Sequence, residues 1–193
     1  WTPLNPRTET LPKGWKGTRS EGIRDDILVE HDVAITVRDG VKLYADVFRP
    51  ANASARSTPA LICWSPFGKK FNGVGSLKLM TPWNLGIPDG TLSGLEKFEA
   101  PDPAEWCPRG YAIINVDSRG AFDSEGVMAI MGTQEAEDGY DTIEWLAKQD
   151  WCNGKVALVG NSHLAIIQWF IAALNPPSLT CIAPWEGCGD LYR

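Results

Sequence analysis

The fold is decided by the stretch Val156-Ala157-Leu158-Val159-Gly160-Asn161-Ser162-His163-Leu164-Ala165. An apolar run ends at Gly160, and an apolar segment of helical composition begins directly after Ser162. A strand that turns into a helix through Gly and Ser is typical of a nucleophile elbow, which lifts the hydroxyl above the sheet edge. The start of the helix offers N–H groups and a partial positive charge to an oxyanion. Ser162 is therefore the candidate nucleophile.

The stretch also permits a plainer interpretation. The usual motif is G-x-S-x-G, but Leu164 stands at its last position and Ala165 follows. A serine that caps a helix after a strand is common in proteins of every function. From Ser162 alone, both interpretations stay open.

The chain before this stretch begins with a hairpin. Residues 33–37 and 41–48 are β-rich and flank Asp39-Gly40, where glycine supplies the positive φ of a tight turn. Continuous apolar runs at residues 60–64 and 111–117 are typical of strands buried on both faces.

Further elements alternate along the chain. Residues 66–101 have no clear period and predict a long loop, and residues 103–108 suit one helical turn. Helices are predicted over residues 134–148 and 163–174, and buried strands over residues 155–160 and 179–184. This order predicts an α/β fold with a mostly parallel sheet and an N-terminal antiparallel hairpin.

The domain division follows from the same pattern. Residues 1–30 are polar and predict an arm on the surface, and residues 31–193 predict the N-terminal part of a catalytic domain. Since the chain stops after its last βαβ unit, we expect it to be truncated. No signal peptide is visible, but the start at Trp1 indicates that the natural start is missing.

Composition excludes several function classes. Apolar residues make up 44%, the net charge is −6 and no basic cluster is present, so no nucleic-acid partner is expected. No run reaches the ~18 apolar residues of a membrane span. The five cysteines form no CxxC pair and predict free thiols in a reducing compartment. Neither a metal-ligand spacing nor a phosphate-binding loop is found, so no metal or other cofactor is expected.

Charged residues near the candidate site are first given structural roles. Lys69 and Lys70 are expected to be solvated, and Asp117 and Arg119 to form a salt bridge that fixes a loop. Glu135 matches the acidic preference of a first helical turn and needs no catalytic role.

Several segments in collinear order resemble one hydrolase family. They are Val37 to Pro50, Trp64 to Lys69, Arg109 to Gly126, Glu137 to Leu146, Trp151 to Val156, Ile182 to Pro184 and Asp190 to Tyr192. The chain is similar over residues ~30–193 to the X-Pro dipeptidyl-peptidase-like (CocE/NonD) α/β-hydrolases, which include cocaine esterase, α-amino-acid ester hydrolases and glutaryl acylases. It looks most like their fungal relatives. The resemblance implies that a lid and a C-terminal β domain are missing from this chain.

The resemblance also implies the site residues. The family nucleophile lies in G-x-S-Y-x-G, which makes Ser162 the nucleophile and the backbone N–H of His163 an oxyanion donor. Phe67 stands where the family has a tyrosine that supplies the second donor. We expect substrate contacts from Trp64, Phe67, His163 and Trp185. The triad Asp and His are expected beyond residue 193, since the fold order is Ser, Asp, His.

The expected function is hydrolysis of a small-molecule ester or amide through an acyl-enzyme on Ser162. Phe67 favours, as an alternative, a biosynthetic enzyme for acyl transfer, cyclisation or C–C cleavage. A non-catalytic module is the third option if the natural chain ends at Arg193. Activity of this fragment alone is not expected, because a lone serine is a poor nucleophile. The location is expected to be cytoplasmic, with secretion as the alternative, and a homo-oligomer or association with the missing C-terminal portion is left open.

Overall fold

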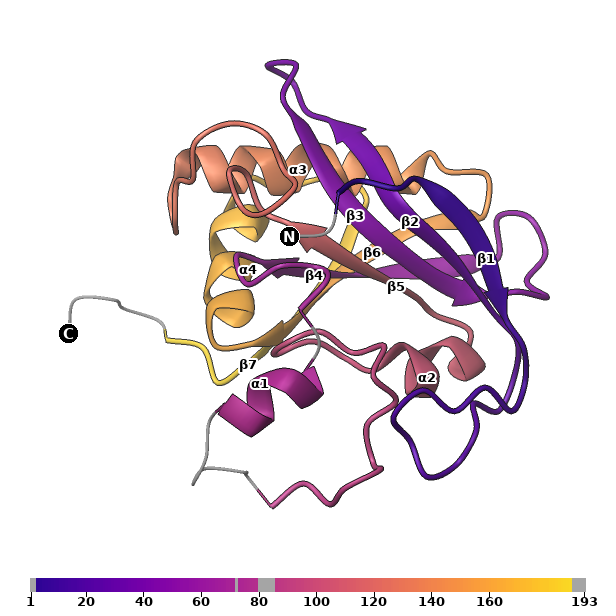
Figure 1. The fold of residues 1–193 in the computed structure, drawn as a ribbon. Helices are drawn as coiled ribbons and strands as arrows, with labels where there is room; N and C mark the ends of the chain where they lie inside the picture. The colour runs from indigo at the N-terminus through magenta and orange to yellow at the C-terminus, as the bar shows by residue number, and fades with distance from the viewer. Residues whose placement is uncertain (1–2, 72, 80–85, 189–193) are drawn as a thin grey trace.

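The strand β4 (Thr58–Ser65) is an inner strand of the sheet. The computed structural model describes residues 3–71, 73–79 and 86–188, and within these the strands form one seven-stranded sheet. Its order is β1 (Arg7–Leu11), β2 (Ile27–Thr36), β3 (Lys42–Pro50), β5 (Ala112–Asp117), β4, β6 (Cys152–Asn161) and β7 (Leu179–Trp185). The predicted strands are all present (Figure 1).

The sheet has a parallel half and an antiparallel half. β5, β4, β6 and β7 pair in parallel, as predicted. β1, β2 and β3 are antiparallel, and β3 joins β5 antiparallel. The hairpin of β2 and β3 turns at Gly40, whose φ is 87°. The antiparallel half is larger than predicted, because residues 7–11 of the expected arm pair with β2, which begins at Ile27 and not at Val33.

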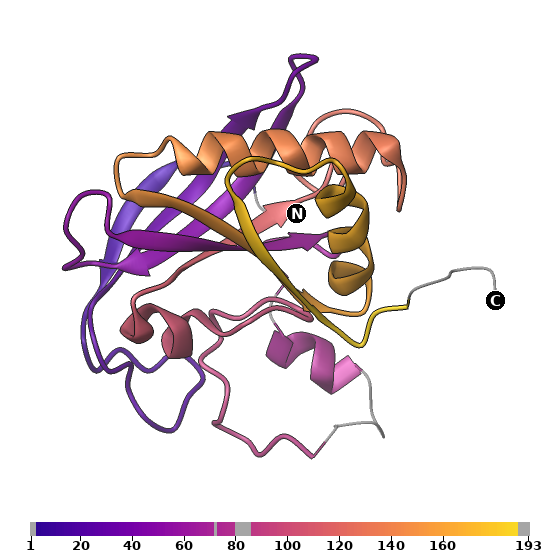
Figure 2. The same ribbon diagram turned by 180° about the vertical axis from the view of Figure 1, so that it is seen from behind.

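Helices cover both faces of the sheet, with α3 (Thr133–Ala147) and α4 (His163–Ala173) on one face. Side chains alternate along a strand, so β4 sends Ile62 towards these helices and Leu61 to the opposite face. That opposite face packs against α2 (Pro103–Trp106) and the 3₁₀ turn η1 (Cys107–Arg109). Figures 1 and 2 show α3 and α2 on opposite sides of the sheet.

The predicted helices are confirmed, and a further one is present. α3 and α4 follow the predicted ranges to within about a residue, and α2 with η1 forms the predicted turn, capped by the Asp102 carboxylate, which accepts from the N–H of Ala104. The segment predicted as a long loop contains α1 (Gly73–Leu79). This short helix escaped prediction because its glycines weaken the helical pattern.

A glycine sets how closely α3 and α4 pack. A Cβ built on Gly139 of α3 would lie 2.4 Å from Cδ1 of Ile171 of α4. The two helices therefore pack at a distance that only glycine permits at this position.

Strand β7 differs from its prediction as a buried strand. Its residues are half-buried or exposed, from Leu179 to Trp185. The reason is that β6 is its only partner among the described strands, so only one of its edges is covered.

Parallel pairing brings the carboxyl ends of four strands to one edge of the sheet. Ser65 at the end of β4 pairs with Asp117 at the end of β5, and Asn161 at the end of β6 pairs with Trp185 at the end of β7. Sheets of this kind bind ligands at this edge. Ser162 follows directly after β6 and lies there.

Candidate active site

Ser162 occupies a strained turn between β6 and α4. Its φ and ψ are 51° and −117°, a combination that a residue with a Cβ rarely adopts. Its N–H donates to the carbonyl oxygen of Trp185 at 3.0 Å, and its own carbonyl accepts from the N–H groups of Ala165 and Ile166 at 2.9 and 3.0 Å. Ser162 is half-buried, so it is not enclosed in the core. Backbone strain that neighbouring bonds maintain is a feature of functional sites.

Small residues let the strand and the helix meet at this turn. Gly160 has a φ of 145°, and a Cβ there would lie 2.5 Å from Cβ of Leu164. Ala165, at the last position of the motif, is fully buried, and a Cβ on Gly187 would lie 3.3 Å from its own Cβ. A larger side chain at position 165 would therefore push against the backbone that follows β7.

His163 begins α4 directly after Ser162. Its N–H has no backbone acceptor among the described residues, as expected for the first turn of a helix. Its imidazole is buried, with Nε2 3.4 Å from Oε1 of Glu135. The other histidine, His31, lies 2.7 Å from Glu9 through Nε2. Both rings thus lie within hydrogen-bond distance of a carboxylate.

Phe67 lies in the loop that follows β4. Its ring packs edge-on against Phe98, with centroids 5.2 Å apart, and against His163 at 6.2 Å. Its N–H donates to Oγ of Ser65 at 3.0 Å. The structure therefore brings together Phe67 and His163, the two residues predicted at the oxyanion site.

The prediction that Lys69 is solvated is wrong. Its side chain is fully buried, where its ammonium donates to Asp32 and lies 3.1 Å from Asp123 and 3.9 Å from Asp46. Burial alone would lower the pKa of Lys69, but these carboxylates raise it above its ordinary value. The cluster ties the loop that carries Phe67 to the strands β2 and β3 and to the loop after β5.

Asp117 and Arg119 have separate partners. Arg119 makes a bidentate pair with Asp138, at 2.7 Å for both bonds, and a further bond of 2.9 Å to Asp39. Asp117 instead accepts from the backbone N–H of Lys69. Burial raises the pKa of Asp117 to about 7. The predicted salt bridge between Asp117 and Arg119 is therefore wrong, because the acids that pair with Arg119 are Asp138 and Asp39.

Glu99 is a neighbour of Ser162 that sequence reasoning missed. Its carbonyl accepts from the N–H of Asn161 at 3.0 Å, and its φ is 64°. Its Oε2 is buried with no hydrogen-bond partner in the described part of the chain. Burial raises the pKa of its carboxyl, and the Ser162 side chain lowers it in part. Its position inside a long aperiodic segment offered no sequence signal.

The two predicted tryptophans lie in different surroundings. Trp185 is 43% exposed at the carboxyl end of β7, beside Ser162. Trp64 is only 1% exposed, and its indole Nε1 donates to Oε1 of Glu135 at 2.9 Å. Its burial in the core favours a packing role over contact with substrate.

Three further observations concern metal ligands, cysteines and membrane spans. Within residues 3–71, 73–79 and 86–188, no group of three or more His, Cys, Asp or Glu side chains is arranged to hold a metal ion. The five cysteines are free thiols. No helix in the described chain has the length and apolar character needed to span a membrane.

Comparisons with known proteins identify the family that this chain resembles. The family model described as X-Pro dipeptidyl-peptidase (S15 family) matches residues 39–193. Cocaine esterase from Rhodococcus sp. (strain MB1 Bresler) is 32% identical over 165 residues, which are 86% of this chain and 25% of that protein. Xaa-Pro dipeptidyl-peptidase from Lactobacillus helveticus (strain DPC 4571) is 28% identical over 88% of this chain and 27% of that protein.

A solved structure agrees with these relatives. The CocE/NonD family hydrolase from Staphylococcus aureus superposes with a TM-score of 0.83 at 34% identity, covering 98% of this chain and 32% of that one. The chain thus spans about a quarter of the length of the curated relatives it matches. The predicted α/β-hydrolase fold is confirmed. The segment Asp190-Leu191-Tyr192, which contributed to the resemblance, lies outside the described residues.

Proposed function

The chain belongs to the X-Pro dipeptidyl-peptidase (S15) family, and from this premise we propose that the natural protein is a serine hydrolase whose nucleophile is Ser162. One observation carries the proposal. Ser162 adopts φ 51° between the strand β6 and the helix α4, at the carboxyl edge of the sheet. No requirement of helix capping explains that strain, because the Ser162 side chain makes no capping bond to α4.

The proposed reaction has two halves. Oγ of Ser162 adds to the carbonyl carbon of an ester or amide, and its proton passes to a base. The oxyanion that forms faces the N–H of His163. Collapse breaks the C–O or C–N bond, and the proton goes to the departing alcohol or amine. Water then attacks the acyl-serine ester, which releases the acid and regenerates the hydroxyl.

The base is proposed to come from a later part of the natural protein. In this fold the triad runs Ser, Asp, His along the chain, which puts both partners after Ser162. The carboxylate partners of His31 and His163 agree with this assignment. We propose Phe67, His163 and Trp185 as the substrate-contact residues, and assign Trp64 to the support of the site because it is buried.

A fluorophosphonate probe tests the nucleophile in the full-length natural protein. We expect mass spectrometry to find the probe on Ser162 alone and Ser162→Ala to be unlabelled. Ser178→Ala is a matched control, because Ser178 is a half-buried serine whose hydroxyl donates to Glu144, away from the site. An unmodified Ser162 in a folded wild-type protein would overturn the assignment.

The relatives suggest which substrates to try. p-Nitrophenyl acetate represents the ester class of the cocaine esterase, and Gly-Pro-p-nitroanilide represents the amide class of the dipeptidyl-peptidases. Turnover of either with an initial burst of p-nitrophenol or p-nitroaniline would support an acyl-enzyme. The likeness to fungal members and a cytoplasmic location stay predictions.

Phe67 supports a second candidate function. Its ring has no hydroxyl to donate to an oxyanion, and loss of one such donor costs about 2.7–4 kcal/mol of transition-state stabilisation in a protease. A biosynthetic enzyme for acyl transfer, cyclisation or C–C cleavage is the alternative. Labelling of Ser162 without hydrolysis of either substrate by the wild-type protein would favour it.

A further inference from the structure

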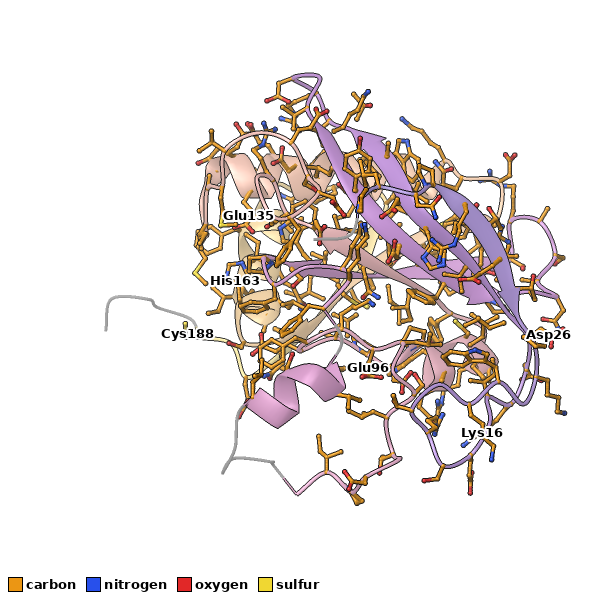
Figure 3. The ribbon with its side chains drawn as sticks, viewed as in Figure 1. Lys16, Asp26, Glu96, Glu135, His163 and Cys188 are labelled. Carbon is orange, nitrogen blue, oxygen red and sulfur yellow. The ribbon has the colours of Figure 1, made fainter. Side chains whose placement is uncertain are left out.

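A buried cluster of polar side chains includes the residue that follows the proposed nucleophile. Oε1 of Glu135 accepts from the indole Nε1 of Trp64 at 2.9 Å and lies 3.4 Å from Nε2 of His163. The three residues are 2%, 1% and 7% exposed and come from α3, β4 and α4. Figure 3 shows Glu135 and His163 on the same side of the molecule. The cluster thus joins β4, α3 and α4 at the residue that follows Ser162.

The burial of Glu135 is not explained by its place in the first turn of a helix. An acidic residue in a first helical turn is normally exposed, and Glu137 on the same helix keeps 34% of its side chain exposed while it pairs with Arg38. Glu135 is instead buried, and a buried carboxylate is costly unless hydrogen bonds satisfy it. Its second oxygen, Oε2, accepts from the N–H of Met131 at 2.6 Å. Both oxygens are therefore engaged, and the carboxylate is held from three sides.

The hydrogen bond that the inference uses runs from Nε2 of His163 to Oε1 of Glu135, the direction in which a carboxylate oxygen accepts. The same ring meets Phe67 edge-on, with centroids 6.2 Å apart. The imidazole is therefore held between the loop after β4 and the start of α3. Glu99 is a further carboxyl close enough to interact electrostatically with His163.

We propose that Glu135 is a positioning residue for the hydrolysis: by accepting a hydrogen bond from the His163 imidazole, it fixes the first residue of α4 and thereby the backbone N–H that faces the oxyanion. The inference rests on the proposed function, because that N–H matters only if Ser162 attacks a carbonyl. Without Glu135 the His163 ring keeps its contact with Phe67 but loses its hydrogen-bond acceptor, and a small misplacement of the neighbouring donor has a large kinetic cost.

The test compares variants of the full-length natural protein, with p-nitrophenyl acetate as substrate and fluorophosphonate titration to count active sites. Glu135→Gln is expected to lower kcat per labelled site by about tenfold or more, with KM nearly unchanged, because the donor acts in the transition state. His163→Phe, which keeps a ring but removes its nitrogens, is expected to cause a similar loss. Glu137→Gln is the matched control and is expected to keep wild-type kcat.

A double variant separates positioning from a general loss of stability. If Glu135 acts through His163, Glu135→Gln should lower kcat less than about twofold further in the His163→Phe background. The same tenfold loss in both backgrounds would overturn the inference, as would wild-type kcat per site in Glu135→Gln. Should Glu135→Gln fail to fold, wild-type kcat in a folded His163→Phe protein would overturn it equally. An unlabelled wild type would instead refute the proposed function, and the inference with it.

Discussion

The rings of Phe67 and His163 meet edge-on, with centroids 6.2 Å apart and planes 73° apart. Phe67 extends from the loop after β4 and His163 opens the helix after β6, so the contact joins the two segments predicted to surround an oxyanion. A phenylalanine at this place supplies shape but no hydrogen-bond donor. The contact therefore suggests a direct gain-of-function variant.

Phe67→Tyr is expected to raise kcat for p-nitrophenyl acetate by about tenfold or more with little change in KM, because it adds a donor of the kind that stabilises oxyanions. Steady-state kinetics of the full-length natural protein check this. Phe98→Tyr is the control, since Phe98 contacts Phe67 without lying in the predicted oxyanion loop. Equal rates for Phe67→Tyr and the wild type would show that the loop places its side chain out of reach.

Gly160→Ala is expected to lower the free energy of unfolding by about 3 kcal/mol or more. Its Cβ would lie 2.5 Å from Cβ of Leu164, and its φ of 145° disfavours any side chain. Gly154→Ala is the matched control, because Gly154 has φ 84° but nothing within 4 Å of its added Cβ. Its cost should stay near ~1 kcal/mol. Chemical denaturation measures both, and equal costs would mean that the elbow relaxes around the methyl group.

Asp138→Asn is expected to destabilise the protein by about 3–5 kcal/mol, because it leaves the buried guanidinium of Arg119 without its bidentate partner. Asp141→Asn offers a comparison one turn further along α3. Asp141 pairs with Arg38, whose side chain is 45% exposed, so that loss should cost about 1 kcal/mol or less. Thermal unfolding midpoints distinguish the two, and similar shifts would argue against a special role for burial.

The raised pKa of Asp117 predicts that the free energy of unfolding falls as the pH rises from about 4 to about 7. Burial raises its pKa in the folded protein to about 7, against an ordinary value of 3.8. In this window the folded state keeps a proton that the unfolded state has lost, so its stabilising contribution is complete below pH 4 and lost as the pH passes 7. The change amounts to at most about 4 kcal/mol.

Asp117→Asn should flatten this part of the pH dependence, because the amide does not titrate. Unfolding free energies of the full-length natural protein at pH 5, 6, 7 and 8 measure the slope. Asp25→Asn, which alters an exposed carboxylate, is expected to leave the slope as it is. An Asp117→Asn slope equal to that of the wild type would mean that Lys69 keeps Asp117 ionised throughout.

The elements that the sequence predicted well are those with a strong local pattern. β4 and β5 are continuous apolar runs, and the hairpin turns at Asp39-Gly40, so both follow from residue type and spacing. β1 was missed because residues 7–10 are polar and exposed, as the residues of a loop are. Its strand character comes from pairing with β2, which is a long-range contact.

Some residues of the candidate site could likewise be predicted from the local sequence, and others could not. Ser162 was found from its neighbours in the sequence, because a strand, Gly160 and a helix surround it within ten residues. Glu99, 63 residues before Ser162, and Lys69 carried no local sign of their role. From the sequence Lys69 is predicted to be a surface charge. Its burial follows only from the fold, which brings Asp32 and Asp123 around it.

The amino-acid sequence by itself determined the strands and helices that have a strong local pattern and the position of the turn at Ser162, because hydrophobic periodicity, glycine and helix starts act over a few residues. Only the tertiary structure decided which charges are buried together and what Glu135 contacts. Those choices depend on pairing between β4, α3 and α4, and the free energy of a buried charge depends on neighbours that are distant along the chain.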